Sequence, residues 1–270
     1  GVNFFHYEKG WHPTATLGIF GAAAGCGRLL RLDENRLAVA LATCVSLACG
    51  VKSNFSTQIK PLHAGVAARS GLLAAQLANE GYTAADNAFE HPQGFLEVFN
   101  GAGNYDASRM LGTWGAPYDL LDPGISIKKY PCVYSVHAAV DAAVLLHDEL
   151  GAKFGEISSV TVRMHRRRLL PHVRRMAQSS LDAKFSLPYA IARALLDGRV
   201  SLEHFENDAW FEPRVRDLMG KVRTEEHDDD ANDYGADVVV EFGAGERASR
   251  MIPIPLGHGP ASPLPAAMLR

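Results

Sequence analysis

The chain has 270 residues and a mass of 29.2 kDa, which is enough for one large domain or two modest ones. Its hydrophobic content of 47% and charged content of 21% are ordinary for a globular protein, and its net charge of −3 argues against a general nucleic-acid binder. The longest apolar run, within residues 37–50, is too short to span a membrane, and the N-terminus lacks a signal-peptide pattern.

The cysteines disfavour a metal centre. They are irregularly spaced and contain no CxxC pair; their positions are Cys26, Cys44, Cys49 and Cys132. An iron–sulfur dehydratase needs a cluster of thiolates, which this spacing does not offer. We therefore expect no metal and a reducing, cytoplasmic-type compartment.

The first hundred residues predict helices rich in small side chains. Residues 14–31 predict a buried helix whose glycines permit close contact with neighbouring helices. Asp33 is the predicted N-cap of a helix over 34–49 that ends at Gly50, and a third helix covers 64–80. Because these helices carry little charge, they should pack against other helices on most faces, and not all of those partners should lie in this chain.

The pattern changes after about residue 122. The stretch "ISIKKYPC" predicts an extended segment or strand, and "HAAVDAAVLLHDELG" predicts an amphipathic helix that ends at Gly151. The alternation in "ISSVTVRMH" predicts a strand, and "SLPYAIARALLDG" predicts a helix capped by Ser186 and ended by Gly198. Two β-like runs flank "GAGE" and predict a hairpin, while the acidic run 225–235 predicts a solvated loop.

These elements predict two domains. Residues 1–122 should form part of a large all-helical domain, and residues 123–255 a smaller α+β domain with a mainly antiparallel sheet. The turn-rich tail, residues 256–270, should begin a return to the helical domain.

Polar residues beside two predicted helices are candidates for chemistry. His12 precedes a helix start, where it either lines a cleft or is hydrogen-bonded at a domain edge. Lys60 and His63 lie where the third helix begins, and cations are unfavourable at a helix N-terminus. A bound carboxylate or phosphate would compensate for them; the alternative is that Lys60 extends into solvent.

A second group surrounds "KKYPCVYSVH". In a strand, Lys128 and Lys129 would point to opposite faces, so that one faces a cleft, and Tyr134 and His137 follow at the next helix start. The alternative is a basic strand end followed by a polar helix start. Cys132 is expected to be a buried structural thiol.

The strongest basic run, residues 163–175, lacks the aromatic residues of a nucleic-acid site. It should form a solvated face or ion pairs with the acidic stretch 225–233.

Four blocks in order resemble the MmgE/PrpD family: "GWHPTATLG", "IKPLHAGVAARSGLLAAQLANEGYT", "KKYPCVYSVHAAVDA" and "DAKFSLPYAIARALLDG". They span residues 10 to about 198. The family includes 2-methylcitrate dehydratase, cis-aconitate decarboxylase and iminodisuccinate epimerase. The resemblance implies a helical domain and a smaller α+β lid, with the active site in the cleft between them. It also implies a homodimer and no cofactor.

The resemblance also assigns roles by position. It makes His12 the general base or acid, and it makes Lys60 and Lys128 the cations that stabilise negative charge on a di- or tricarboxylate substrate. His137 and His63 protonate a leaving hydroxyl or bind carboxylate. The expected catalytic residues are His12, Lys60, Lys128 and His137, and the expected substrate-binding residues are His63, Lys60, Lys128 and Tyr134.

Two departures from the family pattern affect the expected reaction. By the resemblance, cis-aconitate decarboxylases of the family carry a second histidine near the position of Val133. Valine cannot transfer a proton, which makes that activity less expected here. The helical segment that precedes the first block in the family has no counterpart here, so the chain resembles a middle fragment that is expected to be inactive alone. We expect dehydration of a 2-methylcitrate-like hydroxy-tricarboxylate. The alternatives are a dicarboxylate epimerase, a decarboxylase, or a non-catalytic metabolite-binding or dimerisation fragment.

Overall fold

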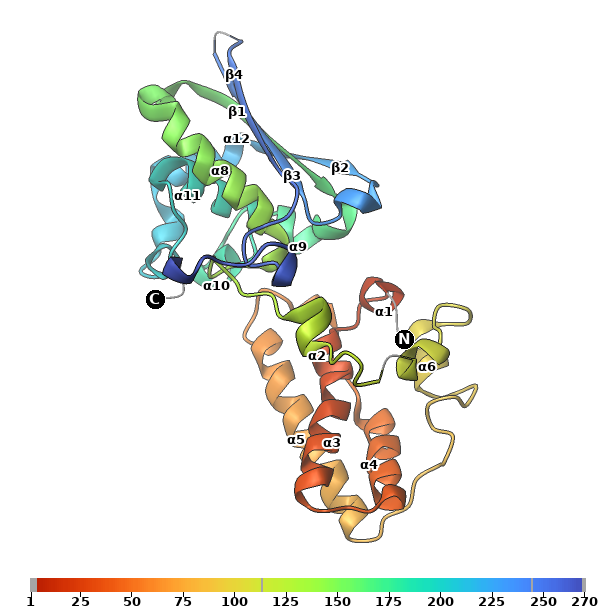
Figure 1. Ribbon diagram of the computed structural model, residues 1–270. Helices are drawn as coiled ribbons and strands as arrows, with labels where there is room; N and C mark the ends of the chain where they lie inside the picture. The colour runs from red at the N-terminus through yellow and green to blue at the C-terminus, as the bar shows by residue number, and fades with distance from the viewer. Residues whose placement is uncertain (1–3, 113, 244, 269–270) are drawn as a thin grey trace. The chain divides into compact units, whose positions relative to one another are not determined.

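The computed structural model of the chain describes residues 4–112, 114–243 and 245–268 (Figure 1). Its contacts divide the chain into two compact units, residues 1–117 and residues 118–270. Each unit buries an apolar cluster of its own. Among the described residues, no helix has both the length and the apolar character needed to cross a bilayer.

The first unit is built from helices. They are α1 (Phe4–Glu8), α2 (Pro13–Thr16), α3 (Gly18–Leu29), α4 (Glu34–Leu47), α5 (Ile59–Asn79), α6 (Phe95–Asn100) and α7 (Ser108–Leu111). The helix expected over 14–31 is divided into α2 and α3 at Leu17. The predicted cap is confirmed, since the Asp33 carboxylate accepts a hydrogen bond from the backbone N–H of Arg36 at 2.8 Å.

Helix α5 starts earlier than expected, at Ile59 instead of residue 64. Pro61 misled the sequence analysis, because proline often marks a helix boundary. It lies here in the first turn, where its missing N–H breaks no intrahelical hydrogen bond. The earlier start places Lys60 and His63 within the helix itself.

A close helix crossing and a group of aromatic rings form the core of the first unit. Gly71 of α5 lies against the α3 backbone, and a Cβ there would come within 2.7 Å of the Ile19 carbonyl oxygen. Trp11 packs on Phe99 with ring centroids 4.6 Å apart, and Phe99 stacks on Phe95 at 4.5 Å.

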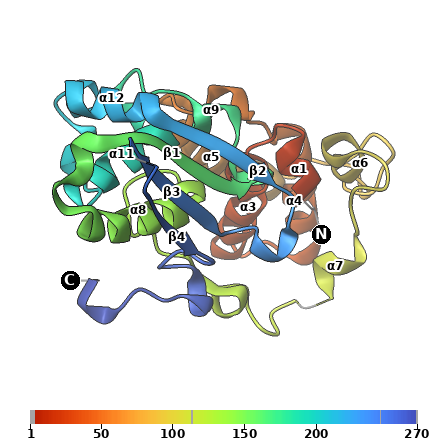
Figure 2. The same ribbon diagram turned by 90° about the horizontal axis from the view of Figure 1, so that it is seen from above.

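The second unit packs helices on a four-stranded sheet. Its helices are α8 (His137–Leu150), α9 (Pro171–Arg174), α10 (Ser180–Ala183), α11 (Leu187–Asp197) and α12 (Pro213–Lys221). Its strands are β1 (Ile157–His165), β2 (Val222–His227), β3 (Ala236–Phe242) and β4 (Arg247–Ile252). They lie side by side in the order β2–β1–β3–β4 (Figure 2).

The sheet is mixed, and the expected mainly antiparallel arrangement holds for two of its three strand pairings. β3 pairs antiparallel with β1 and with β4, but β2 pairs parallel with β1. β2 was missed because Glu225 and Glu226 belong to the acidic run that was assigned to a loop. These side chains are exposed on an edge strand, where charge is tolerated and discourages pairing with other chains.

Several other expectations for this unit are confirmed. Residues 157–165 form a strand whose Val160, Val162 and Met164 are fully buried, and the hairpin forms between β3 and β4. Ser186 caps α11 by accepting from the backbone N–H of Tyr189, and Gly198 ends it in the left-handed conformation. For residues 125–132 the sequence left an extended segment or a strand open, and the structure shows a non-helical segment that joins no strand of the described sheet.

The basic and acidic runs neutralise one another, as the sequence suggested. Arg166, Arg167 and Arg168 pair with Asp228, Asp230 and Asp233 at 2.7, 2.7 and 2.6 Å. Arg174 also pairs with Glu226. The basic run is therefore no free anion-binding surface.

The tail after β4 contains two short 3-10 turns, Gly259–Ala261 and Ala266–Met268. Its first part contacts the segment before α8, where the backbone N–H of Ile127 donates to the carbonyl of Gly257 at 2.8 Å. The assignment of residues 256–270 to the helical domain stays a prediction.

Replacing Gly71 with alanine should destabilise the protein. The added methyl group would overlap Ala22 Cβ at 2.6 Å and the α3 backbone, and overpacking of this kind costs about 1–3 kcal/mol of unfolding free energy. Gly65→Ala is the matched control on α5, because a Cβ there meets no described atom within 4 Å. It should stabilise the helix by up to about 1 kcal/mol. Urea unfolding of both variants would measure the difference, and equal effects would contradict the tight α3–α5 crossing.

Candidate active site

His12 and His63 are brought into direct contact, although 51 residues separate them in the chain. Their Nδ1 atoms lie 2.9 Å apart, so one donates a hydrogen bond and the other accepts it. The two side chains are 8% and 9% exposed. With Nδ1 engaged in this contact, Nε2 is the nitrogen on each ring left for a substrate.

Backbone pairing holds His12 in place. Trp11 forms an isolated antiparallel bridge with Val51, and the backbone N–H of His12 donates to the Gly50 carbonyl at 2.9 Å. His12 is extended, with φ of −95° and ψ of 105°, as expected before Pro13. The side chain therefore stands at the start of α2 and faces α5.

Gly50 is needed for this approach. Its φ is +140°, which side-chain-bearing residues rarely adopt. A Cβ at this position would meet Ala15 Cβ at 2.5 Å and the His63 ring at 3.6 Å. The predicted helix end thus also provides the space in which the two histidines meet.

Positive groups surround this histidine pair. Lys60, in the first turn of α5, lies with its Nζ 5.4 Å from the centroid of the Phe55 ring, which packs edge-on against His12 at 4.9 Å. Lys52 follows the bridge and was not singled out from the sequence; its Nζ lies 3.4 Å from the centroid of the Tyr7 ring. No signal marked Lys52, because it is an isolated lysine in a loop.

The surroundings shift the pKa of both basic groups. Burial, followed by the positive influence of His63, Lys60 and Lys52, lowers the pKa of His12 to about 4. Burial lowers the pKa of Lys52 to about 8, against an opposing effect of Glu8. At neutral pH His12 is therefore an uncharged imidazole beside cations, which is the state a general base requires.

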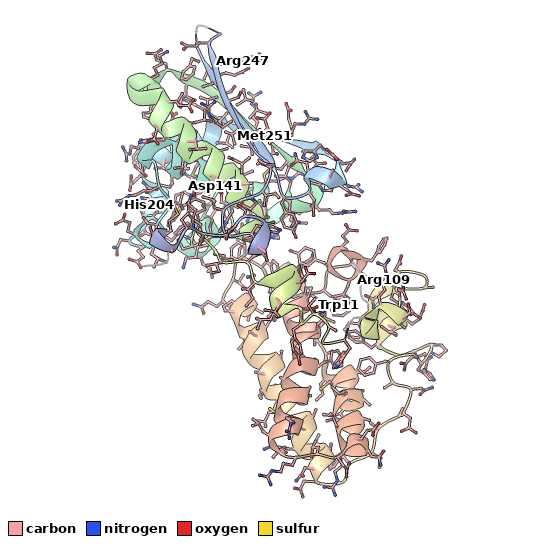
Figure 3. The ribbon with its side chains drawn as sticks, viewed as in Figure 1. Trp11, Arg109, Asp141, His204, Arg247 and Met251 are labelled. Carbon is pink, nitrogen blue, oxygen red and sulfur yellow. The ribbon has the colours of Figure 1, made fainter. Side chains whose placement is uncertain are left out.

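In the second unit, Asp141 organises the segment that leads into α8 (Figure 3). Its carboxylate accepts from Lys129 Nζ and from the Tyr130 hydroxyl, both at 2.7 Å, and from the backbone N–H of Leu256 at 3.0 Å. Lys128 instead donates to the Cys132 carbonyl at 3.1 Å. Lys129 is therefore held in an ion pair and Lys128 is exposed, and no strand alternation separates them. That Lys128 faces a cleft stays a prediction.

His137 begins α8 and is fully buried. Its ring lies 5.2 Å from Tyr130 and 5.0 Å from Tyr134, and among the described residues neither ring nitrogen makes a well-formed hydrogen bond. Burial and then Lys128 lower its pKa to about 4, while the Cys132 carbonyl acts in the opposite direction. An unsatisfied buried imidazole is costly, and such groups are common where a ligand completes the bonding.

Cys132 is confirmed as a buried structural thiol. It is 4% exposed, and burial raises the pKa of its thiol to about 12, so it holds its proton at neutral pH.

The six residues predicted for the site fall into two groups of three. His12, Lys60 and His63 lie together in the first unit. Lys128, Tyr134 and His137 lie together in the second. A histidine that the sequence analysis missed, His258, accompanies the second group: its Nδ1 lies 2.7 Å from the Tyr134 hydroxyl.

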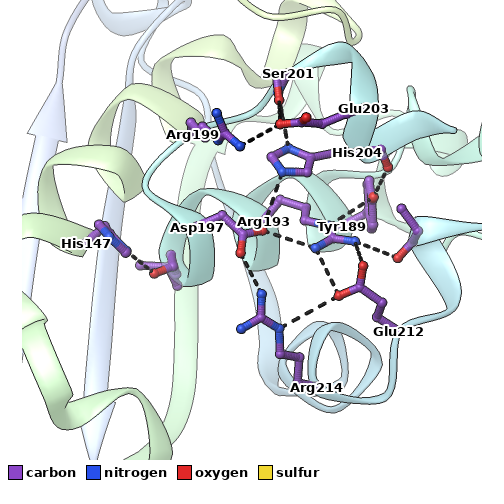
Figure 4. A network of polar contacts seen from close by, with 12 residues as sticks. His147, Tyr189, Arg193, Asp197, Arg199, Ser201, Glu203, His204, Glu212 and Arg214 are labelled. Carbon is purple, nitrogen blue, oxygen red and sulfur yellow. Dashed lines mark hydrogen bonds and ion pairs between the residues drawn. The ribbon is translucent and has the colours of Figure 1, made fainter.

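A polar pocket of about 410 Å³ in the second unit is a rival candidate (Figure 4). Its charges are already paired. Arg193 binds Asp197 at 3.1 Å and Glu212 at 2.8 Å, and Arg214 binds Asp197 at 2.7 Å. The Tyr189 hydroxyl donates to the His204 carbonyl. These ion pairs and this hydrogen bond therefore connect α11 to the turns that follow it. In the described part of the chain, no cluster of histidine, cysteine or carboxylate side chains has the arrangement of a metal site.

Two protein-family models match the chain. Residues 1–108 match the family model of the MmgE/PrpD N-terminal domain, and residues 130–270 match that of the MmgE/PrpD C-terminal domain. Cis-aconitate decarboxylase from Aspergillus terreus is 32% identical over 272 residues, covering 93% of this chain and 55% of that protein.

Two further relatives extend the comparison. Human cis-aconitate decarboxylase is 29% identical over 80% of this chain and 45% of its own length. The 2-methylcitrate dehydratase of Salmonella typhimurium is 25% identical over 48% of this chain and 29% of its own length. The chain thus spans about half the length of the decarboxylases that it matches. With both domain models matched in order, the chain belongs to the MmgE/PrpD family.

Proposed function

We propose that the whole protein is a lyase that breaks a bond next to a carboxylate of a small tri- or dicarboxylate. The observation that carries this proposal is the contact between His12 and His63 beside Lys60 and Lys52. A neutral, buried imidazole can exchange a proton with carbon, and the lysines favour negative charge on the substrate. The relatives with decarboxylase and dehydratase names support the same class of reaction.

Each candidate residue has a proposed role in binding or proton transfer. Lys60 and Lys52 hold substrate carboxylates, and His12 exchanges the proton through Nε2 while His63 fixes its ring. Lys128, Tyr134 and His137 of the second unit also bind carboxylate, which supplies the missing hydrogen bond of His137. Three further expectations stay predictions: that the protein needs no cofactor, that it forms a homodimer, and that it is cytoplasmic.

Decarboxylation of a cis-aconitate-like substrate is the first reaction to test. The C–C bond to a carboxylate breaks, CO₂ leaves, and the electron pair left on carbon takes a proton from an imidazolium. A histidine becomes this imidazolium by taking a proton from water when the negative charge of the bound substrate raises its pKa. The decarboxylase matches are longer and more similar than the dehydratase matches, and this favours decarboxylation over the dehydration that the sequence analysis put first.

Dehydration of a 2-methylcitrate-like substrate is the second candidate. A base removes the proton next to a carboxylate, and the hydroxyl leaves as water after it takes a proton from an acid. Val133 favours this reading, because it offers no proton at the position where a decarboxylase histidine is expected.

Proton NMR of the full-length gene product in D₂O would separate these reactions. Cis-aconitate, 2-methylcitrate, citrate and iminodisuccinate are supplied separately. Loss of CO₂ from cis-aconitate supports decarboxylation, and a new alkene signal from 2-methylcitrate supports dehydration. Exchange of the iminodisuccinate α-proton without elimination would move the protein to the epimerases. No change in any substrate would overturn the proposal and favour a non-catalytic binding protein.

Replacing Lys60 with alanine should lower kcat/KM on the accepted substrate by about 100-fold or more, because a cation that stabilises developing charge is lost. Lys9→Ala is the control, since exposed Lys9 donates to the Val98 carbonyl and lies outside the proposed site. Steady-state kinetics and circular dichroism would test both variants. Near-normal turnover by folded Lys60→Ala would refute the role of this lysine.

The pKa of His12 should be near 4 and should rise in Lys60→Met, because a repelling cation is removed. The folded protein then binds fewer protons than the unfolded chain between about pH 6.5 and 4. This histidine therefore stabilises the fold above the unfolded pKa, and that contribution is lost as the pH falls through this window. Imidazole ¹⁵N NMR titration would measure the shift, with Lys221→Met as the control. An ordinary His12 pKa in the wild-type protein would contradict the buried pair.

A further inference from the structure

His258 lies in the tail after β4, and its ring is enclosed by side chains from three other segments. Its Nδ1 is 2.7 Å from the Tyr134 hydroxyl, and its ring is 4.2 Å from that of Tyr234. Arg168 forms an ion pair with Asp233 at 2.6 Å, and its Cζ lies 3.9 Å from the centroid of the Tyr234 ring. Segments far apart in sequence thus converge on one imidazole.

The backbone fixes this histidine. The N–H of Ile127 donates to the Gly257 carbonyl at 2.8 Å, and the N–H of Gly257 donates to the Ser262 carbonyl at 2.7 Å. Gly257 has φ of +88°, and a Cβ there would lie 2.0 Å from the Ile127 carbonyl oxygen. The tail is therefore clamped to the segment that leads to Lys128, and His258 cannot turn away without breaking that clamp.

The protonation states indicate the direction of the hydrogen bond. Burial and then Arg168 lower the pKa of His258, so its ring is neutral at pH 7. Burial raises the pKa of Tyr134, and hydrogen bonding by Ser126 opposes it, which places a donor on the Tyr134 oxygen. The Tyr134 hydroxyl can donate to Nδ1 of a neutral His258, and the imidazole then carries its proton on Nε2.

Tyr134 in turn borders His137, with ring centroids 5.0 Å apart. In the described part of the chain, His137 has no well-formed hydrogen bond, which leaves its ring nitrogens for a substrate. A substrate bound there also meets the neighbouring Tyr134 ring, so the orientation of Tyr134 matters. We propose that His258 is a positioning residue: it accepts the hydrogen bond of the Tyr134 hydroxyl and so fixes Tyr134 beside His137 for substrate binding and turnover. This inference rests on the proposed lyase function.

The test uses the full-length protein with the substrate that it converts. His258→Phe keeps the ring but loses the acceptor, and it should lower kcat by about tenfold to 100-fold, the cost of a misplaced group in an active site. His258→Asn places an amide oxygen near the position of Nδ1, and it should recover most of that loss. His91→Phe is the control, because exposed His91 only accepts from the backbone N–H of Gln93 in the first unit.

A double-mutant cycle separates positioning from a general loss of packing. If His258 acts through Tyr134, adding His258→Phe to Tyr134→Phe should change kcat by less than about twofold. The independent readout is ¹⁵N NMR of the wild-type imidazole, which should report the Nε2–H tautomer for His258.

The outcomes distinguish the two proposals. Wild-type turnover together with unchanged kinetics of His258→Phe, or fully additive effects in the cycle, would overturn the positioning role and leave the lyase function standing. Loss in His258→Asn equal to that in His258→Phe would also overturn it. No turnover of any substrate by the wild-type protein would overturn the lyase function and, with it, this role.

Discussion

The site of the first unit depends on how closely the backbone before α2 approaches the backbone after α4. The bridge between Trp11 and Val51 and the hydrogen bond from His12 to Gly50 hold these segments together. That approach is possible because residue 50 has no side chain, and it brings His12 to His63 on α5. The α3–α5 crossing uses the same device at Gly71. Small residues thus set the distances on which the polar contacts depend.

The two units differ in the charges around their candidate site residues. The first unit surrounds the His12–His63 pair with lysines, and burial, followed by the repulsion of His63 and these lysines, lowers the pKa of His12. The second unit contains a buried carboxylate, Asp141, that satisfies Lys129, Tyr130 and the tail backbone. A carboxylate ligand would reduce the repulsion in the first unit and would meet an already neutralised framework in the second. This difference explains why the cations of the first unit are the better candidates for anion binding.

Local signals in the sequence predicted much of the fold. Asp33, Ser186 and Gly198 act at helix ends as expected, and the strand of residues 157–165 follows its alternation, because each depends on neighbouring residues. The parallel pairing of β2 was missed because its glutamates resemble a loop and its partner is distant in sequence. The site residues could be named from the family blocks, but not Lys52 or His258. Each is a single residue in a turn, and only the folded backbone brings it to the others.

The strand order of the second unit has a consequence for how it folds. β1 is central and pairs with β2 and β3, both of which follow it only after α11 and α12. Among the described strands, the β3–β4 hairpin is the one pairing with a short connection, because helices separate β1 from β2 and β3 in the chain. Closing the longer loops costs chain entropy before any contact is gained, so this topology favours slow assembly. During synthesis on the ribosome, β1 would emerge with its apolar face uncovered and remain so until the second half of the unit follows. Until then its valines and methionine, which are fully buried in the folded unit, are open to chaperones and to aggregation.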